Sequence, residues 1–337
     1  MAPAGIDAVA LTRALVDIDS TTGSEGEAGR YLAEYLRTLG YAVTEQPVDS
    51  RRFNVIALLD PPSVVFSTHF DCVPPFFPSR VERARLYGRG ACDAKGILAA
   101  QVAAADRLRR EGERRVGLLF VVGEERGSDG ARAANLTPPG SRYLVDGEPT
   151  DRRLGEATRG LLRVRLRASG RAAHSSFPEL GESAIDKLLD ALMTLRGIAL
   201  PSDERLGSTH YTVGLISGGV APNVVSPSAE AEVLFRTVTD ARDVRQALAP
   251  LESRVTIEHI LEVPPARMAV VPGFERAVFP YTTDIPFLAG WGTPLLYGPG
   301  SIHVAHTADE FIEIDELLAA ADGYVAIARA LSSDRDA

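Results

Sequence analysis

Apolar residues in the first half of the chain follow two kinds of pattern, helical spacing and short unbroken runs. Asp7 to Asp17 and Glu25 to Leu39 have helical spacing, with Ser24 as the expected N-cap of the second helix and Gly40 as its C-terminal stop. A segment from Ala94 to Arg110 is also helical and has the length of a crossover. The unbroken runs predict buried, largely parallel strands, and they are Phe53 to Leu59, Val64 to Ser67, Val116 to Val122 and Tyr143 to Val145.

The pattern changes near Thr158 to strict alternation. Leu162, Val164 and Leu166 alternate with arginines, which predicts a strand with one face in water. A helix, two strands, a helix and a strand follow, near residues 182–196, 211–216, 229–235, 241–251 and 254–261. This β-α-β-β-α-β order predicts a ferredoxin-like α+β unit.

The buried-strand pattern returns at Pro294 to Tyr297, and a last helix is expected from Ile314 to Leu331. We therefore expect an α/β domain at residues 1–157 and 265–337, with a mixed, largely parallel sheet flanked by helices. The ferredoxin-like unit at residues 158–264 is expected to interrupt it as an inserted domain.

Charge and composition narrow the class of partner. The chain has 36 basic and 45 acidic side chains in 337 residues, a formal net charge of −9. This balance argues against a nucleic acid or an anionic membrane as partner and favours a small molecule. The two cysteines, Cys72 and Cys92, exclude a disulfide scaffold and suit a reducing compartment. Since no apolar run reaches the ~18 residues of a membrane span and no secretory signal is visible, we expect a cytoplasmic location.

Side chains that commonly bind metals follow the buried runs. They are His69 and Asp71, Glu124 and Glu125, Glu148, and His303 and His306, with Asp93 in a Gly-rich segment before the crossover helix. Ligands of open α/β sheets collect at the carboxyl ends of the strands. Taken singly, each residue could be a structural histidine or a solvated acid. Together, two histidines and three or four carboxylates exceed the needs of one catalytic zinc and predict a dinuclear hydrolytic site with a bridging carboxylate.

Two further roles follow from local geometry. Adjacent side chains in extended backbone diverge, so only one of Glu124 and Glu125 readily binds metal, and the other faces the bound water as a general base. Asp71 is expected to accept the second ring N–H of His69 and so to orient that imidazole.

Rival classes of protein are less well supported. A nucleotide-binding dehydrogenase needs Gly-x-Gly-x-x-Gly, but Asp93 stands at the third glycine position of the segment that begins at Gly88. A serine hydrolase needs Gly-x-Ser-x-Gly, which the chain lacks. A non-catalytic protein that uses the metals only for structure stays possible, although it would not need the spare glutamate.

The ordered motifs resemble those of the M20 metallopeptidase family. They are His69-x-Asp71, Gly88-Arg89-Gly90-x-x-Asp93-x-Lys95-Gly96, Glu124-Glu125, Gly147-Glu148-Pro149-Thr150 and Ala305-His306-x-x-Asp309-Glu310. Within the family the chain resembles the branch of acetylornithine deacetylase and succinyl-diaminopimelate desuccinylase. The resemblance implies a zinc-exopeptidase-like catalytic domain with an inserted lid and dimerisation domain.

The resemblance also implies a ligand set for two divalent ions, expected to be zinc, with cobalt or manganese as alternatives. One ion is held by His69 and Glu148, the other by Glu125 and His306, and Asp93 bridges them. Glu124 falls on the general base of the family. The spacing to Asp309-Glu310 favours His306 over His303.

The resemblance extends to substrate residues. Gly170-x-x-x-His174-Ser175 is similar to the lid motif whose histidine is donated to the neighbouring subunit to stabilise the oxyanion, which implies a homodimer. Asn223 lies in a segment similar to the substrate-contacting lid segment. Arg236 stands where the family tends to place a carboxylate-binding arginine, with a solvated strand end as the alternative. Thr283 resembles a substrate-side position more loosely.

The expected substrate is an N-acyl amino acid. Acetylornithine is the first choice, which would place the enzyme in arginine biosynthesis, and acetylcitrulline, acetyl-lysine and succinyl-diaminopimelate are alternatives. A dipeptide is less expected because the dipeptidase branch usually has Asp where this chain has Glu148. Ala94 and Cys72 depart from the usual residues of the family, and both departures bear on specificity rather than on metal binding.

Overall fold

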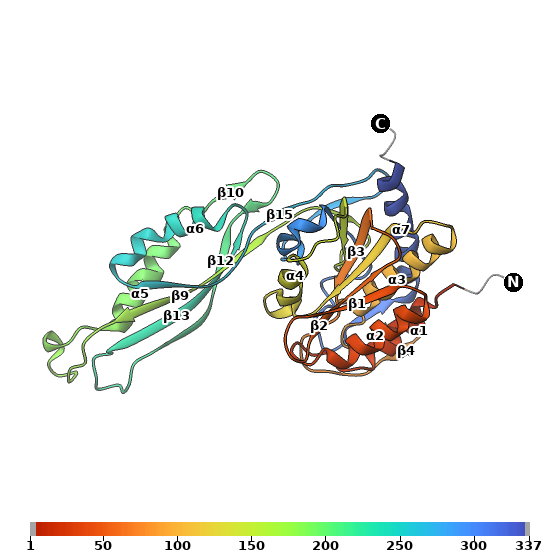
Figure 1. Cartoon of the computed structure of the whole chain (residues 1–337). Coiled ribbons are helices and arrows are strands. Elements are labelled where there is room, and N and C mark those ends of the chain that lie inside the picture. The colour runs from red at the N-terminus through yellow and green to blue at the C-terminus, as the bar shows by residue number, and fades with distance from the viewer. Residues whose placement is uncertain (1–4, 334–337) are drawn as a thin grey trace. The chain divides into compact units, whose positions relative to one another are not determined.

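The computed structural model describes residues 5–333 and divides into two compact units (Figure 1). The first unit contains the described residues of Met1–Glu156, Arg267–Ala277 and Thr283–Ala337, and the second contains Ala157–Ala266 and Val278–Thr282. The inserted domain was predicted at residues 158–264. The second unit covers that range and adds the short segment that ends at Thr282.

A six-stranded mixed sheet forms the centre of the first unit. Its order is β1-β2-β6-β3-β7-β17, with β1 at Ala42–Pro47, β2 at Phe53–Leu58, β3 at Val64–His69, β6 at Val116–Val121, β7 at Tyr143–Asp146 and β17 at Thr293–Leu296. Strand β3 runs parallel to β6 and β7, and β17 runs parallel to β7. Strand β2 pairs antiparallel with β1 and β6, so the run at Phe53 to Leu59 is an exception to the expected parallel order.

Helices cover this sheet and explain why its strands lack polar alternation. They are α1 (Ala8–Val16), α2 (Gly26–Thr38), α3 (Lys95–Arg110), α4 (Asp129–Ala134) and α7 (Ile314–Ser333). Neighbouring residues of one strand are buried in different clusters: Phe66 packs with residues of α1, α2, α3 and α7, whereas Val65 packs with Ala131 and Ala134 of α4. Both faces of the strand are therefore apolar. The predicted α/β fold with a mixed sheet flanked by helices is confirmed.

The ends of the first two helices test the capping predictions. Asp7 caps α1, because its carboxylate accepts hydrogen bonds from the backbone N–H of Val9 and Ala10 at 3.0 Å. Ser24 does not cap α2, so that prediction is wrong: the N-cap residue is Glu25, and it makes no side-chain cap bond. Gly40 follows the end of α2 with φ of +88°, a conformation in which glycine carries no Cβ penalty, and its role as a stop is confirmed.

The second unit has a four-stranded antiparallel sheet of order β12-β13-β9-β14. Its strands are β9 (Gly160–Ser169), β12 (His210–Gly218), β13 (Ser228–Thr237) and β14 (Thr256–Val263), and its helices are α5 (Ala184–Arg196) and α6 (Ala241–Leu248). The chain order is β-α-β-β-α-β, as predicted. Helix α6 stops three residues before the predicted end at Leu251, where a 3₁₀ turn continues the chain.

Several short strands were not predicted from the pattern. They are β4 (Arg80–Glu82), β5 (Arg85–Tyr87), β8 (Leu154–Thr158), β10 (Ser202–Asp203), β11 (Gly207–Ser208), β15 (Ala266–Arg267), β16 (Arg276–Phe279) and β18 (Phe311–Glu313). Strands of two to five residues carry too few positions to show a period. Within residues 5–333 no helix has both the length and the apolar character that crossing a membrane requires.

Candidate metal centre

Five of the predicted ligand residues come together in the first unit. They form two groups of three, His69 with Asp93 and Glu148, and Asp93 with Glu125 and His306. In each group the potential ligand atoms lie within 4.8 Å of one another. His69 is the last residue of β3, and Glu148 follows β7 by two residues, so the sheet brings both to one edge. The ligand roles of these residues stay a prediction.

Asp93 belongs to both groups because its two oxygens face different histidines. Its Oδ1 lies 3.0 Å from His69 Nε2, and its Oδ2 lies 3.3 Å from His306 Nε2. His306 Nε2 also lies 2.9 Å from Glu125 Oε1. Asp93 is 5% exposed, whereas the side chain of His306 is 47% exposed. The first group is therefore buried, and the second opens to solvent on the His306 side.

Asp71 has a wider role than the orientation of one imidazole. His69 Nδ1 lies 3.1 Å from the Asp71 backbone oxygen and 3.4 Å from its Oδ1. The buried carboxylate also accepts the hydroxyl of Thr22 at 2.9 Å and the backbone N–H groups of Glu124 and Glu125 at 3.1 and 3.3 Å. Asp71 thus fixes the turn that carries both glutamates as well as the ring of His69.

The acids of the centre raise the proton affinity of both histidines. Hydrogen bonds with Asp93 and Glu125 raise the pKa of His306 to about 10. Burial lowers the pKa of His69, but hydrogen bonds with Asp71 and Asp93 outweigh it, and the pKa lies well above its usual value. Positive charge is therefore strongly favoured in this cluster.

The charge and the atom types of the cluster fit divalent cations. Burial, followed by the charge of Asp93, raises the pKa of Glu148 well above its usual range. A bound cation would relieve that cost because it stabilises the ionised carboxylate. Three carboxylates and two imidazoles are a donor set that suits zinc, cobalt or manganese. The residues present thus fit the two-metal site predicted from the sequence.

Glu124 lies beside this cluster and belongs to neither donor group. Burial raises its pKa well above the usual value, His69 opposes this shift, and the charge of Asp284 adds to it. The expectation of extended backbone at this pair is wrong, because Glu124 and Glu125 begin a 3₁₀ turn at Glu124–Arg126. Glu125 Oε1 faces His306 Nε2, whereas Glu124 is in neither donor group. The role of Glu124 as general base stays a prediction. His303 is likewise in neither group.

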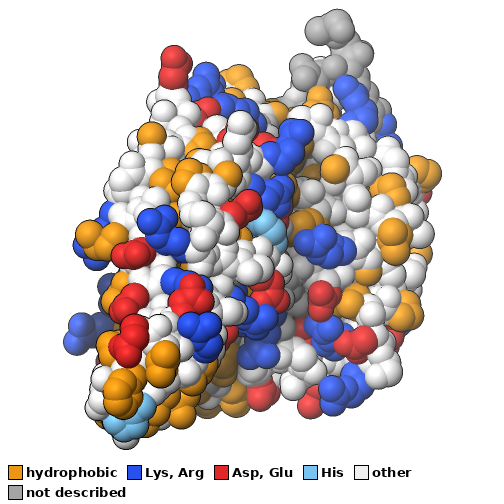
Figure 2. Space-filling view, turned by 90° about the vertical axis from the view of Figure 1, so that its left-hand side faces the viewer, with side chains coloured by type: hydrophobic (Ala, Val, Ile, Leu, Met, Phe, Trp, Pro, Cys, Tyr) orange, Lys and Arg blue, Asp and Glu red, His pale blue; other side chains and the backbone are white. Residues whose placement is uncertain are grey.

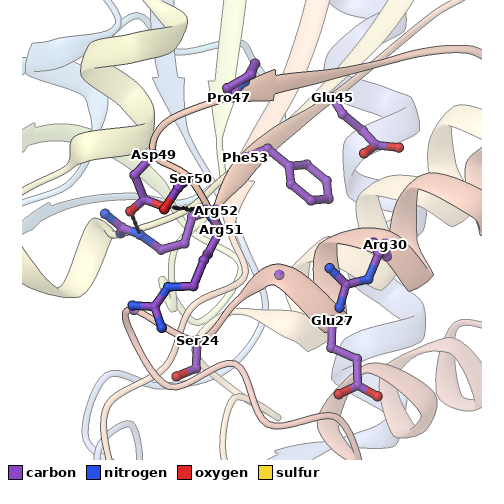
Figure 3. Close-up of a pocket in the computed structure, with 12 residues that line it drawn as sticks. Ser24, Glu27, Arg30, Glu45, Pro47, Asp49, Ser50, Arg51, Arg52 and Phe53 are labelled. Atoms are coloured by element: carbon purple, nitrogen blue, oxygen red, sulfur yellow. Dashed lines mark hydrogen bonds and ion pairs between the residues drawn. The ribbon is translucent and has the colours of Figure 1, made fainter.

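Arg52 forms ion pairs with acids from three segments of the first unit, and the sequence analysis did not single it out. Its guanidinium lies 2.6 Å from Asp49, 3.1 Å from Asp129 at the start of α4, and 3.5 Å from the buried Glu25. Figure 3 shows Arg52 beside Asp49 in the wall of an open groove of about 630 Å³, which contains none of the donor residues. No local signal could reveal Arg52, because two of its partners are 27 and 77 residues away in sequence.

The predicted lid residues lie in the second unit. His174 forms an isolated bridge with Val224, and its Nδ1 accepts the backbone N–H of Ser176 at 3.1 Å. The backbone oxygen of Asn223 accepts the N–H of Ser175 at 3.0 Å. The His174 segment and the Asn223 segment are thus paired. Thr283 lies in the first unit, where its buried hydroxyl accepts the N–H of Ile285 at 3.2 Å.

Arg236 is part of a cationic cluster in the second unit. It is half-buried and has no ion pair within residues 5–333. Burial and the nearby charge of Arg159 lower its pKa. Arg159 Nη1 lies 2.6 Å from His210 Nδ1, and His210 faces Arg236 across the β12 and β13 pair. Among residues 5–333 neither guanidinium group has an ion pair with an acid, and two such groups form an environment that favours an anion.

The chain is similar to known peptidases in both sequence and fold. The profile of "Peptidase family M20/M25/M40" matches residues 65–330. A probable carboxypeptidase of Aspergillus terreus is 39% identical and the match covers 93% of this chain and 83% of that protein. The structure of aminopeptidase PepT from Bacillus cereus has a TM-score of 0.80 at 22% identity and covers 96% of this chain and 98% of the other. A dinuclear metal-binding M20 peptidase from Bacillus subtilis has a TM-score of 0.73 at 15% identity and covers 97% and 98%.

Proposed function

Because the chain belongs to peptidase family M20/M25/M40 and is therefore a hydrolase of that family, we propose that it cleaves an amide bond whose amine half is an amino acid with a free α-carboxylate. The observation that carries this proposal is the pair of donor groups that share Asp93, with Glu124 beside them and outside both. A carboxypeptidase and an N-acyl-amino-acid deacylase both cleave a bond of this kind.

Two divalent cations would be held by the two donor groups, with zinc as first choice and cobalt or manganese as alternatives. When bound, they supply Lewis-acid polarisation of the carbonyl and lower the pKa of water. Glu124 takes the proton from the attacking water and returns it to the leaving amine. Asp71 keeps the His69 ring and the Glu124 turn in place, through the contacts described above.

Recognition of the carboxylate is proposed for Arg236. Its guanidinium has no ion pair with an acid in the described part of the chain, and the neighbouring charge of Arg159 strengthens the field that attracts an anion. Arg159 is itself held by the backbone oxygen of Leu206 at 2.7 Å. Asn223 and Thr283 complete the proposed substrate residues. Acetylornithine remains the first proposed N-acyl substrate, and the name of the Aspergillus relative adds peptides with a free C-terminal residue.

The test is amine release by the zinc-supplemented protein over a panel of substrates. We expect turnover of acetylated amino acids such as acetylornithine, acetylcitrulline or acetyl-lysine, or of short peptides, and none when the α-carboxylate is converted to a carboxamide. The variant Arg236→Met is expected to raise KM with a smaller change in kcat, since it removes a contact to a remote group of the substrate.

Arg167→Met is the matched control for this assay. Arg167 lies on the solvent face of the same sheet and pairs with Glu230 and Glu258. It should leave KM unchanged. Equal cleavage of the acid and the carboxamide would refute the proposed specificity. No turnover of any substrate in the panel, with two metals bound, would favour a non-catalytic protein that uses the metals only for structure.

A homodimer through the second unit is proposed as the working form, with His174 donated to the partner to stabilise the oxyanion. Strand β12 is an edge strand, paired within the described residues only with β13. Leu215 and Ile216 on it are 63% and 58% exposed. Exposed apolar side chains are visible between charged ones on the face drawn in Figure 2. An exposed apolar edge favours pairing with another strand.

Sedimentation velocity tests the dimer. We expect the native chain to sediment as a dimer and Ile216→Lys to sediment as a monomer, because the charge would be buried at the shared edge. Leu136→Lys is the control, since Leu136 is 82% exposed in the first unit. A native protein that stays monomeric at micromolar concentration would contradict the proposal.

A further inference from the structure

Glu310 is a buried acid that binds no proposed metal and yet has four hydrogen-bond donors. Its Oε1 accepts the backbone N–H groups of Gly90, Cys92 and Asp93, each at 3.0 Å. Its Oε2 accepts Arg89 Nη1 at 2.6 Å. Glu310 is 0% exposed, and Arg89 is 2% exposed. Charge-assisted bonds of this kind, away from water, hold a loop in one conformation.

These bonds connect the two loops that carry Asp93 and His306. Glu310 ends the loop that contains His306, four residues earlier, and its carboxylate binds the loop that ends at Asp93. The backbone adds a further link, because the N–H of Gly88 donates to the Glu310 backbone oxygen at 3.1 Å. The spacing between Asp93 Oδ2 and His306 Nε2, 3.3 Å, is therefore set across this contact.

The two donor groups depend on this contact to different degrees. His69 and Glu148 of the buried group are placed by strands β3 and β7, whose hydrogen bonds to neighbouring strands do not involve Glu310. In the second group both Asp93 and His306 lie on the loops that Glu310 joins. His306 also has φ of +63°, a conformation that a non-glycine residue keeps only when its surroundings hold it.

We propose that Glu310, together with Arg89, is a positioning residue that keeps Asp93 and His306 in register and so sets the metal affinity of the group formed by Asp93, Glu125 and His306. The inference rests on the proposed two-metal centre. Partners behind metal ligands typically change metal affinity by about 10- to 100-fold when they are removed.

The test is calorimetric titration of the chelator-stripped chain with Zn²⁺, native and Glu310→Gln. Glutamine has the same shape, but in either orientation its NH₂ group puts a donor where the carboxylate accepted a hydrogen bond. We expect the weaker binding event to lose about 10- to 100-fold in affinity and the stronger event to change much less. Visible absorption of the Co²⁺-loaded protein gives a second readout, since its bands report the coordination of the altered ion.

Two further variants keep the result interpretable. Arg89→Lys keeps the charge and loses the planar fork, so it should shift the weaker event in the same direction by less, and it serves if Glu310→Gln does not fold. Asp106→Asn is the matched control: Asp106 is 2% exposed and is paired with Arg109 and Arg110 within α3. It should leave both Zn²⁺ affinities unchanged.

The outcomes separate this inference from the proposed function. A native chain that binds fewer than two Zn²⁺ ions would remove the two-metal centre itself. If the native chain binds two, then unchanged affinities in folded Glu310→Gln and Arg89→Lys overturn the positioning role. An equal fall at both sites also overturns it, because the proposal assigns the larger effect to the group formed by Asp93, Glu125 and His306. The same fall in Asp106→Asn overturns it as well, because that substitution leaves the contact between the two loops intact.

Discussion

Replacement of Glu124 by glutamine is expected to lower kcat by about 10²- to 10⁴-fold, the usual contribution of a positioned general base, while both metals stay bound. Glu124 lies outside both donor groups, so metal binding does not need its charge. The amide keeps the size of the side chain but cannot accept the proton of the attacking water. The measurement is kcat together with the zinc content of the same preparation.

Glu125→Gln is the informative neighbour for this experiment. Glu125 Oε1 contacts His306 at 2.9 Å and belongs to the second donor group. The Glu125→Gln variant is therefore expected to lose bound zinc as well as activity. Full metal content with a near-native kcat in Glu124→Gln would exclude Glu124 as the base, and loss of zinc in that variant would make it a ligand.

Asp93→Ala is expected to bind neither metal and to show only background activity. Asp93 is shared, so its loss leaves each donor group with two side chains instead of three. Its charge is also strongly stabilised: burial raises the pKa of Asp93, but hydrogen bonds from His306 and His69 outweigh this and hold the pKa well below its usual value. Plasma mass spectrometry of dialysed protein measures the metal-to-chain ratio, and circular dichroism checks the fold.

Variants that remove a ligand from only one donor group are the comparison for Asp93→Ala. His306→Ala and Glu148→Ala each remove a ligand from one group only. Each is expected to keep about one metal per chain. A folded Asp93→Ala protein that still binds one metal would show that Asp93 does not serve both groups.

Much of the centre could be predicted because its residues stand next to strong local patterns. His69 ends one buried run, Glu125 and Glu148 closely follow two others, and parallel strands bring their carboxyl ends to one edge. The placement of Asp93 and His306 depended more on motif order. Their meeting at 3.3 Å agrees with the shared ligand expected from the resemblance.

Other features carried no usable pattern. Strand β2 is buried in its middle on both faces, so its residues read the same whether its neighbour is parallel or antiparallel. Strand β1 was missed because it is a largely exposed edge strand with a polar sequence. The Ser24 prediction failed because α2 begins one residue later than expected, with Glu25 as its N-cap residue. The Glu25 carboxylate does not cap the helix and instead accepts the N–H of Gly23 at 2.7 Å.

The sequence by itself determined helices α1, α2, α3 and α7 and the buried strands of the first unit, the alternation of the second, and the set of side chains able to bind metals, since these depend on residues close together in the chain. The short helix α4 was not predicted. Only the tertiary structure decided how those side chains are held. The carboxylates of Asp71 and Glu310 bind backbone N–H groups 53 and 217 residues away, at Glu124 and Asp93. Every residue except proline offers such an N–H, so no pattern of side chains indicates which ones a buried acid will bind.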